Sequence, residues 1–145
     1  MFAAGAHETM TSDRSPALAP AQRGLVDTDT TPPGLRGGRC RDCDFRFFPF
    51  QTYGCERCGA HGDRLLPHTM DGRGTILSTA GLGPGDDPCV LARIAIDGGP
   101  EVRALVDGAV GYVPPGTRVC ATLTGVPAAP GAEPEYELRF VPEPA

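Results

Sequence analysis

The sequence predicts a mostly β protein in which a small cysteine-rich unit precedes a barrel of five short strands. Glycine and proline supply 20 and 16 of the 145 residues, a density that disfavours a helical bundle and favours strands joined by turns. Four of the six cysteines fall within residues 40–58, and apolar residues alternate with polar ones in most of the segments after residue 75. We therefore expect three parts, formed by residues 1–34, 35–70 and 71–145.

Residues 1–34 are rich in alanine, threonine and proline, and breaker residues interrupt them throughout. We expect a flexible segment, or one that a partner orders. A short helix over residues 21–26 would need such support, because isolated short helices are marginal. The first ten residues contain no basic cluster and no apolar run approaches the roughly 18 residues of a membrane helix. We therefore expect a cytoplasmic protein without a membrane segment.

Residues 35–70 contain two C-x-x-C pairs, Cys40 with Cys43 and Cys55 with Cys58. Two such pairs place four sulfurs around one Zn²⁺, and four sulfurs leave no coordination position for water or substrate. Gly59 follows the second pair, where the turn needs unusual backbone angles. We therefore expect a structural zinc ribbon. Iron with a redox function is the alternative, and nothing in the sequence suggests the export that disulfides would require.

The sequence offers no active site of its own. Cys89 and Cys120 are expected to be buried spectators in or beside strands, and His61 is not needed as a ligand because the four-cysteine set is complete. The paired carboxylates Asp86 and Asp87 fall in a glycine- and proline-rich loop, where a solvated turn is expected. We therefore expect that the chain is not catalytic alone.

Four of the six phenylalanines lie between the cysteine pairs, in residues 45–50. A ribbon of this size cannot bury four such side chains by itself. We expect some of them to contact the barrel or another protein, and a purely internal small core is the alternative.

Residues 71–145 contain five segments expected to form strands, namely residues 75–79, 90–97, 102–106, 118–123 and 135–140. Most alternate with the two-residue period of a half-buried strand, and Asp97-Gly98-Gly99-Pro100 predicts a hairpin turn between the second and third. Five short antiparallel strands cannot leave their edges open cheaply. We therefore expect a closed five-stranded barrel of the OB-fold type, whose binding loops would be residues 81–88 and 126–134.

A ribbon followed at once by this barrel resembles the acyl-CoA-associated OB-fold proteins with an N-terminal rubredoxin-like zinc ribbon. The resemblance extends from residue 34 to about residue 140, and its order of ribbon, first barrel strand and Pro-Gly turn is more specific than the cysteine pairs alone. Asp44 departs from it, since glycine is usual there, and the tail lacks an aromatic helix that many members carry. The carrying segments are residues 35–43 (LRGGRCRDC), Phe48-Pro49, residues 55–59 (CERCG), residues 72–79 (GRGTILST) and residues 113–117 (VPPGT).

The resemblance implies a non-catalytic subunit of a thiolase-fold acyl-CoA enzyme, such as a thiolase, a retro-aldolase or an acyltransferase. In that family a thiolase-like homodimer carries the catalytic residues. The small subunit docks on it, usually in a two-plus-two heterotetramer, and helps to shape the acyl-CoA site.

Arginine binds phosphate groups through paired hydrogen bonds, and the ribbon carries the basic stretch of the chain, with a net charge of +2 over residues 36–64. Its arginines would contact CoA, or would instead offset the excess negative charge of four thiolates on zinc. Two phenylalanines would meet the partner or the pantetheine arm of CoA. The candidate CoA- or partner-binding residues are Arg36, Arg39, Arg41, Arg46, Phe47, Phe48 and Arg57.

A second hypothesis is a module that binds single-stranded nucleic acid, because ribbons and OB-folds often do so. The net charge of −5, the absence of lysine and the low aromatic content of 6% argue against it, since strand binding needs stacking side chains in a positive groove. The accessory subunit is therefore the favoured interpretation.

Overall fold

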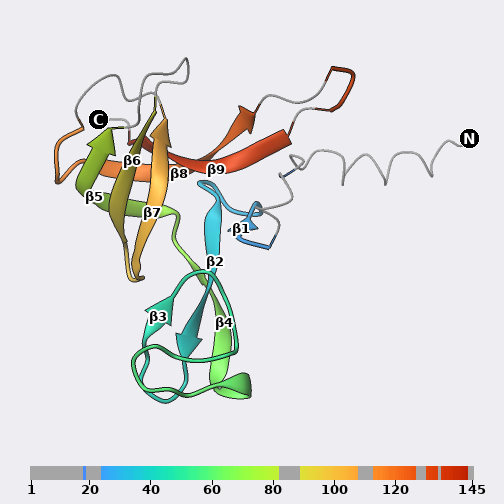
Figure 1. The fold of residues 1–145 in the computed structure, drawn as a ribbon, viewed down its shortest axis with the longest axis vertical. Coiled ribbons are helices and arrows are strands. Elements are labelled where there is room, and N and C mark those ends of the chain that lie inside the picture. Colours follow the sequence, from blue (N-terminus) through green and yellow to red (C-terminus); the bar gives the residue numbers. More distant parts are fainter. Residues whose placement is uncertain are drawn as a thin grey trace, which may run out of the picture.

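The protein consists of a narrow ribbon joined end-on to a barrel (Figure 1). The computed structural model describes residues 18, 24–81, 89–107, 113–126, 130–133 and 135–143. These residues form nine strands and one short 3-10 helix, Gly62–Arg64. Within this part of the chain, no helix has the length and hydropathy needed to cross a bilayer.

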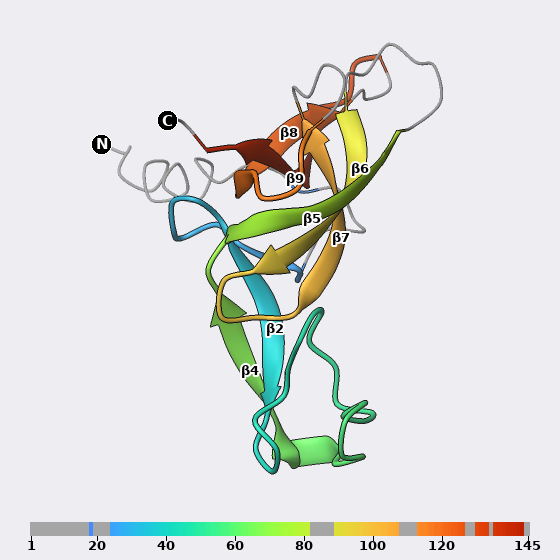
Figure 2. The same cartoon turned by 90° about the vertical axis from the view of Figure 1, so that its left-hand side faces the viewer.

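The ribbon is built on the long strand β2 (Gly34–Cys40), whose two edges are both paired. On one edge lie the two-residue strands β1 (Val26–Asp27) and β3 (Arg46–Phe47), and on the other lies β4 (Leu65–Met70). The β2–β4 pairing runs from Leu35 opposite Met70 to Cys40 opposite Leu65. The two strands thus form a continuous connection between the barrel and the cysteine cluster (Figure 2).

The barrel contains the five expected strands, which are β5 (Arg73–Gly81), β6 (Cys89–Ile96), β7 (Glu101–Asp107), β8 (Arg118–Val126) and β9 (Glu135–Pro142). They close in the order β5-β6-β7-β9-β8, which is the strand order of an OB-fold. The predicted hairpin turn between β6 and β7 is confirmed. One expectation is wrong: β7 and β9 pair in parallel, through Val106 and Phe140, and not antiparallel.

The barrel core reaches into the ribbon strands. Leu35 of β2 and Met70 of β4 belong to the same buried cluster as Ile76, Ile94 and Phe140. The contribution of β6 to this core follows from its alternation, because buried residues such as Ile94 and Ile96 alternate with more exposed ones. The ribbon is therefore anchored by apolar side chains that close one end of the barrel.

The N-terminal segment is ordered differently from the expected helix where it is described. Val26 lies in strand β1, so the predicted helix over residues 21–26 is wrong at that end, and residues 21–23 lie outside the described residues. Leu18 forms an isolated bridge with Tyr136 of β9. The predicted division at residue 35 falls inside β2. The two expected binding loops, residues 81–88 and 126–134, lie mostly outside the described residues.

Candidate metal centre

The two cysteine pairs form turns with the same hydrogen-bond pattern. Cys40, at the end of β2, donates its N–H to the carbonyl of Phe45 over 2.8 Å and accepts at its own carbonyl from the N–H of Asp44. In the second turn, the N–H of Cys55 donates to the carbonyl of Ala60 over 2.7 Å, and the carbonyl of Cys55 accepts from the N–H of Gly59. The repeated pattern fixes two cysteines per turn on the side facing the other turn.

Each turn places one residue in the left-handed backbone region. Gly59 has φ 82° in the second turn, which confirms the expectation that this position needs unusual angles. Asp44 holds the equivalent position in the first turn with φ 65°. Aspartate tolerates this region better than most side chains, so the turn keeps its shape without the glycine usual there.

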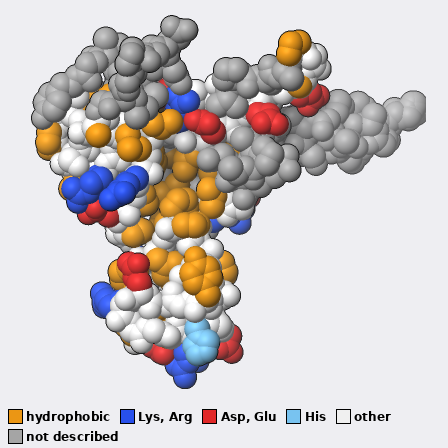
Figure 3. Space-filling view, in the orientation of Figure 1, with side chains coloured by type: hydrophobic (Ala, Val, Ile, Leu, Met, Phe, Trp, Pro, Cys, Tyr) orange, Lys and Arg blue, Asp and Glu red, His pale blue; other side chains and the backbone are white. Residues whose placement is uncertain are grey.

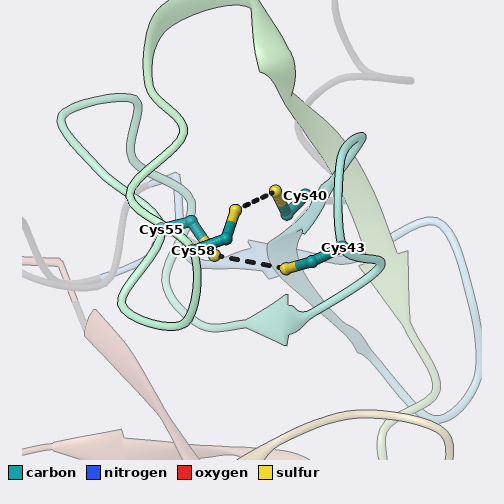
Figure 4. A group of neighbouring side chains, drawn as sticks. All are labelled: Cys40, Cys43, Cys55 and Cys58. Carbon is teal, nitrogen blue, oxygen red and sulfur yellow. Dashed lines mark hydrogen bonds between the residues drawn. The ribbon is translucent and has the colours of Figure 1, made fainter.

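The four cysteine sulfurs converge at the tip of the ribbon (Figure 4). All four Sγ atoms of Cys40, Cys43, Cys55 and Cys58 lie within 4.8 Å of one another. The Sγ atoms of Cys40 and Cys58 are 3.5 Å apart, and those of Cys43 and Cys55 are 3.7 Å apart. A tetrahedron with metal–sulfur distances of about 2.3 Å has edges of about 3.8 Å. The cluster therefore has the size and donor set that a tetrahedral thiolate metal site requires.

The protonation of the thiols is also suited to a cation. Burial raises the pKa of Cys55. Hydrogen bonds from the backbone N–H groups of Cys58 and Arg57 and from neighbouring thiols outweigh this effect and lower the pKa to about 7. The backbone N–H of Ala60 lowers the pKa of Cys58, while its hydrogen bond with the Cys40 thiol and its burial raise it to about 12. One thiol thus ionises near neutral pH, and a bound cation would deprotonate the others.

The sulfur cluster is continuous with the small apolar core of the ribbon. Cys40 and Cys55 are buried together with Phe47 and Leu65, and Phe45 packs against them. A core of this size is too small to hold a fold alone. The stability of the ribbon therefore depends on a cross-link between its four cysteine sulfurs. Four sulfurs would complete the tetrahedral coordination of a metal ion. Such a site can stabilise the ribbon but leaves no coordination position for a substrate.

Several of the predicted arginines are paired within the chain. Arg39 contacts Asp44 at 3.2 Å, and Arg46 contacts the same carboxylate at 3.5 Å. Arg46 also donates to the carbonyl of Gly98, in the barrel hairpin, over 3.0 Å. The alternation of Arg and Asp within residues 39–46 is the sequence signal for this pairing.

The remaining predicted arginines differ in their surroundings. Arg36 donates to the carbonyl of Val26 over 3.1 Å, and Arg57 donates to the carbonyl of Cys43 over 2.9 Å. The Arg41 side chain is exposed and has no partner among the described residues. In this part of the chain, no arginine side chain bonds to a cysteine sulfur, so direct compensation of the thiolates by arginine is not observed.

The phenylalanines divide between the two units. Phe47 is 8% exposed, belongs to the ribbon core and stacks between Phe45 and Phe50. Phe48 packs against the barrel core instead. The expected contact between this segment and the barrel is therefore confirmed, through Phe48. Phe50 and Tyr53 remain 37% and 87% exposed.

The other chemically active side chains do not join the cluster. Cys120 is half-buried in β8, and Cys89 opens β6, although its side chain lies outside the described residues, as do Asp86 and Asp87. Within the described part of the chain, neither His61 nor His68 hydrogen-bonds through its side chain to another residue. The structure therefore brings together the four predicted ligands and, among the side chains that it describes, none of the other candidates.

Comparison with known proteins shows a likeness at the level of structure. No protein-family model matches the chain, and no curated protein matches it. Among solved structures, it is similar to one described as "Ltp2-ChsH2(DUF35) aldolase", with 22% sequence identity and a TM-score of 0.53. The likeness covers 75% of this chain and 84% of the other. At this identity it shows a shared fold.

Proposed function

We propose that this chain is a non-catalytic, zinc-containing subunit of a thiolase-fold acyl-CoA enzyme. The observation that carries the proposal is the extent of the structural likeness to the aldolase component, which covers 75% of the chain. Residues 71–145 amount to about half of the 145 residues, so the likeness extends well beyond the barrel. Single ribbons and single OB-folds serve many functions, whereas their combination is much more specific.

Zinc is the metal that we propose for the cluster, held by Cys40, Cys43, Cys55 and Cys58. It would supply a structural cross-link, because four thiolates complete its coordination. Metal binding contributes about 10–16 kcal/mol in small thiolate domains, which is ample for a ribbon with so small a core. The ribbon would thereby present a rigid surface to a partner.

The partner that we propose is a thiolase-like homodimer that carries the catalytic residues, in a two-plus-two heterotetramer. A cavity of 380 Å³ lies where the ribbon meets the barrel, with Phe48, Tyr53 and Pro100 in its wall. Hydrophobic side chains gather over this junction (Figure 3). Such a surface suits a protein partner or the pantetheine arm of acyl-CoA. Arg36, Arg41 and Arg57, which are exposed on the ribbon, would contact the partner or the CoA phosphates.

Co-expression with a thiolase-like protein encoded beside this chain tests the proposal. We expect the two to co-purify, with about one zinc per copy of this chain. As a matched pair, Tyr53→Ala at the junction should weaken the complex, whereas Leu77→Ala, on the barrel surface, should not. Separate elution of the two wild-type proteins would contradict the proposal, and a coloured, iron-loaded protein would favour the redox alternative.

A further inference from the structure

The outer face of the barrel carries a pocket that is separate from the metal centre. It lies over β5, β6 and β7 and has a volume of about 220 Å³. Basic side chains gather on this flank of the barrel (Figure 3). The wall includes Ser78, Ala80, Leu91, Arg93 and Arg103. Neither the cysteine cluster nor the proposed docking surface contributes to it.

Two arginines face each other across neighbouring strands in this pocket. Arg93 of β6 is the direct register partner of Arg103 of β7, and Ser78 of β5 is the register partner of Arg93 on its other side. The three polar side chains therefore form one row across three strands. Like charges directly opposite each other destabilise a sheet, and Glu101 offsets this cost for Arg93 but contacts only that one of the two arginines.

The two arginines differ in their partners. Arg93 is held by Glu101, to which its Nε donates over 2.8 Å and its Nη2 lies within 2.7 Å, and its Nη1 lies 3.4 Å from the Ser78 hydroxyl. Arg103 is exposed, and no described residue gives it a hydrogen bond or an ion pair. Most other described arginines, including Arg39 and Arg46 of the ribbon, are paired with a carboxylate or a carbonyl. Glu101 thus orients one guanidinium beside the cavity, and among the described residues the second guanidinium has no counter-ion.

The rest of the wall is apolar. Leu91 is 36% exposed and lies in the next cross-strand row, between Ala80 of β5 and Leu105 of β7. A cationic row beside an apolar row matches a ligand with an anionic group on an organic body. None of the described residues in the pocket wall is aromatic, so these residues give no stacking platform of the kind that single-stranded nucleic acid requires.

We propose that this pocket binds the phosphoryl group of a small organic molecule. Arg103 donates paired hydrogen bonds to the phosphoryl oxygens, which is the geometry that guanidinium groups favour, and Arg93, held in place by Glu101, adds a donor from its Nη1. The Ser78 hydroxyl is a third donor, and Leu91 with Ala80 packs against the organic body. The inference does not depend on the accessory role, because it concerns the isolated chain.

Calorimetric titration of the full chain with adenosine 3′,5′-bisphosphate tests the proposal. We expect saturable binding, and we expect Arg103→Gln to weaken it about tenfold, since a hydrogen bond from a charged group to the ligand is lost. Arg64→Gln is the matched control, because it removes the same charge at the ribbon and should leave the affinity within twofold. Arg103 is exposed, so thermal melting should show that the variant remains folded.

Two further probes separate the sources of the phosphoryl group. Inorganic pyrophosphate should bind more weakly than the bisphosphate, because it has no organic body for Leu91 to contact. Equal affinity for the two probes, or equal losses in Arg103→Gln and Arg64→Gln, would overturn the proposal. Absence of binding by both probes at millimolar concentration would also overturn it, as would tighter, Arg103-dependent binding of a single-stranded oligonucleotide.

Discussion

At the scale of single residues, Asp44 shows how the ribbon tolerates a departure from the usual turn. Among the described residues, it is the non-glycine residue with a positive φ. Its carboxylate contacts Arg39 of β2 and Arg46 of β3. The Asp44 side chain, which makes the positive φ unfavourable, thus also links two strands. Surface ion pairs of this kind contribute modestly, which makes the backbone angle the larger consideration.

Replacing Asp44 separates these two effects. Asp44→Ala and Asp44→Gly both remove the ion pairs, but only glycine adopts φ 65° without steric cost. We expect the glycine variant to be more stable than the alanine variant by about 1 kcal/mol, measured by thermal unfolding of the zinc-loaded protein. Gly59→Ala should cost a similar amount at the equivalent position. Identical melting temperatures for the two Asp44 variants would contradict the assigned geometry.

Asp97 and Arg118 supply a test by pH. Both carboxylate oxygens of Asp97 accept from Arg118, over 2.8 and 2.6 Å. The hydrogen bond from Arg118 lowers the pKa of Asp97, although burial opposes it. A lowered pKa in the folded state adds stability above the unfolded pKa of about 3.9, and this stability is lost as the pH falls through the folded value.

Asp97→Asn should therefore lower the melting temperature near pH 7 and have a diminishing effect below pH 4. Both side chains are largely exposed, so the effect at pH 7 should be small. Arg64→Gln, which disrupts the exposed pair with Asp42 at the ribbon, is the control for a general charge effect. A constant difference between wild type and Asp97→Asn from pH 7 to pH 3 would show that the ion pair does not contribute.

At the scale of elements, Arg46 joins the ribbon to the barrel. It lies in β3, and its Nη1 donates to the carbonyl of Gly98 in the β6–β7 turn over 3.0 Å. The turn itself is closed by the N–H of Gly99 donating to Ile96. Together with Phe48 against the barrel core, this bond sets the direction in which the ribbon leaves the barrel.

Arg46→Ala should loosen this junction. We expect faster hydrogen exchange at the amides of residues 97–100, because the turn loses its contact with the ribbon. Arg39→Ala removes a neighbouring ion pair with Asp44 but no contact with the barrel, and it should leave exchange in the turn unchanged. Equal exchange in the two variants would show that Arg46 does not hold the junction.

Strand alternation made most elements predictable, and the exceptions have physical reasons. Ile94 and Ile96 are inward because β6 alternates, and the four-residue turn at residue 97 fixes the hairpin register. The same register pairs Arg93 with Arg103, so this row could have been inferred from sequence. Strand β1 could not be predicted, because two residues are too few to show an alternation of apolar and polar side chains. The parallel β7–β9 contact has one register pair, which leaves no pattern in either strand.

The metal site was predictable for a different reason. Ligand spacing within a turn is local, so the pairs Cys40 with Cys43 and Cys55 with Cys58 can be recognised from the sequence alone. The pairing of ribbon arginines is only partly local, because Arg39 and Arg46 meet the nearby Asp44, whereas Arg64 meets Asp42 from 22 positions away. Composition therefore predicted a basic patch, whereas the structure shows that carboxylates occupy part of it.

At the scale of the whole molecule, the cysteine cluster and the barrel lie at opposite ends of the β2–β4 pair, whose course can be followed in Figure 2. Cys40 and Leu65 end this pair in the ribbon core, and Leu35 and Met70 end it in the barrel core. Loss of the metal would therefore release the ribbon tip first. The barrel keeps its own buried cluster and its closed set of strands.

Cys40→Ser tests this division. We expect loss of zinc and unfolding of the ribbon, with faster exchange at residues 40–64, while the amides of the barrel strands remain protected. Cys120→Ser, which changes a half-buried cysteine outside the cluster, should retain zinc and ribbon protection. Retained zinc in Cys40→Ser, or simultaneous loss of protection in ribbon and barrel, would contradict the structural role assigned to the cluster.

The most direct test of the proposed accessory role is acyl-CoA turnover measured for this chain alone, for the thiolase-like partner alone and for the two together. The account predicts no turnover by this chain, strongly reduced turnover by the partner, and full activity only for the complex. The Cys40→Ser chain should fail to restore that activity. Turnover by the isolated chain, or equal turnover by the partner with and without it, would contradict the account.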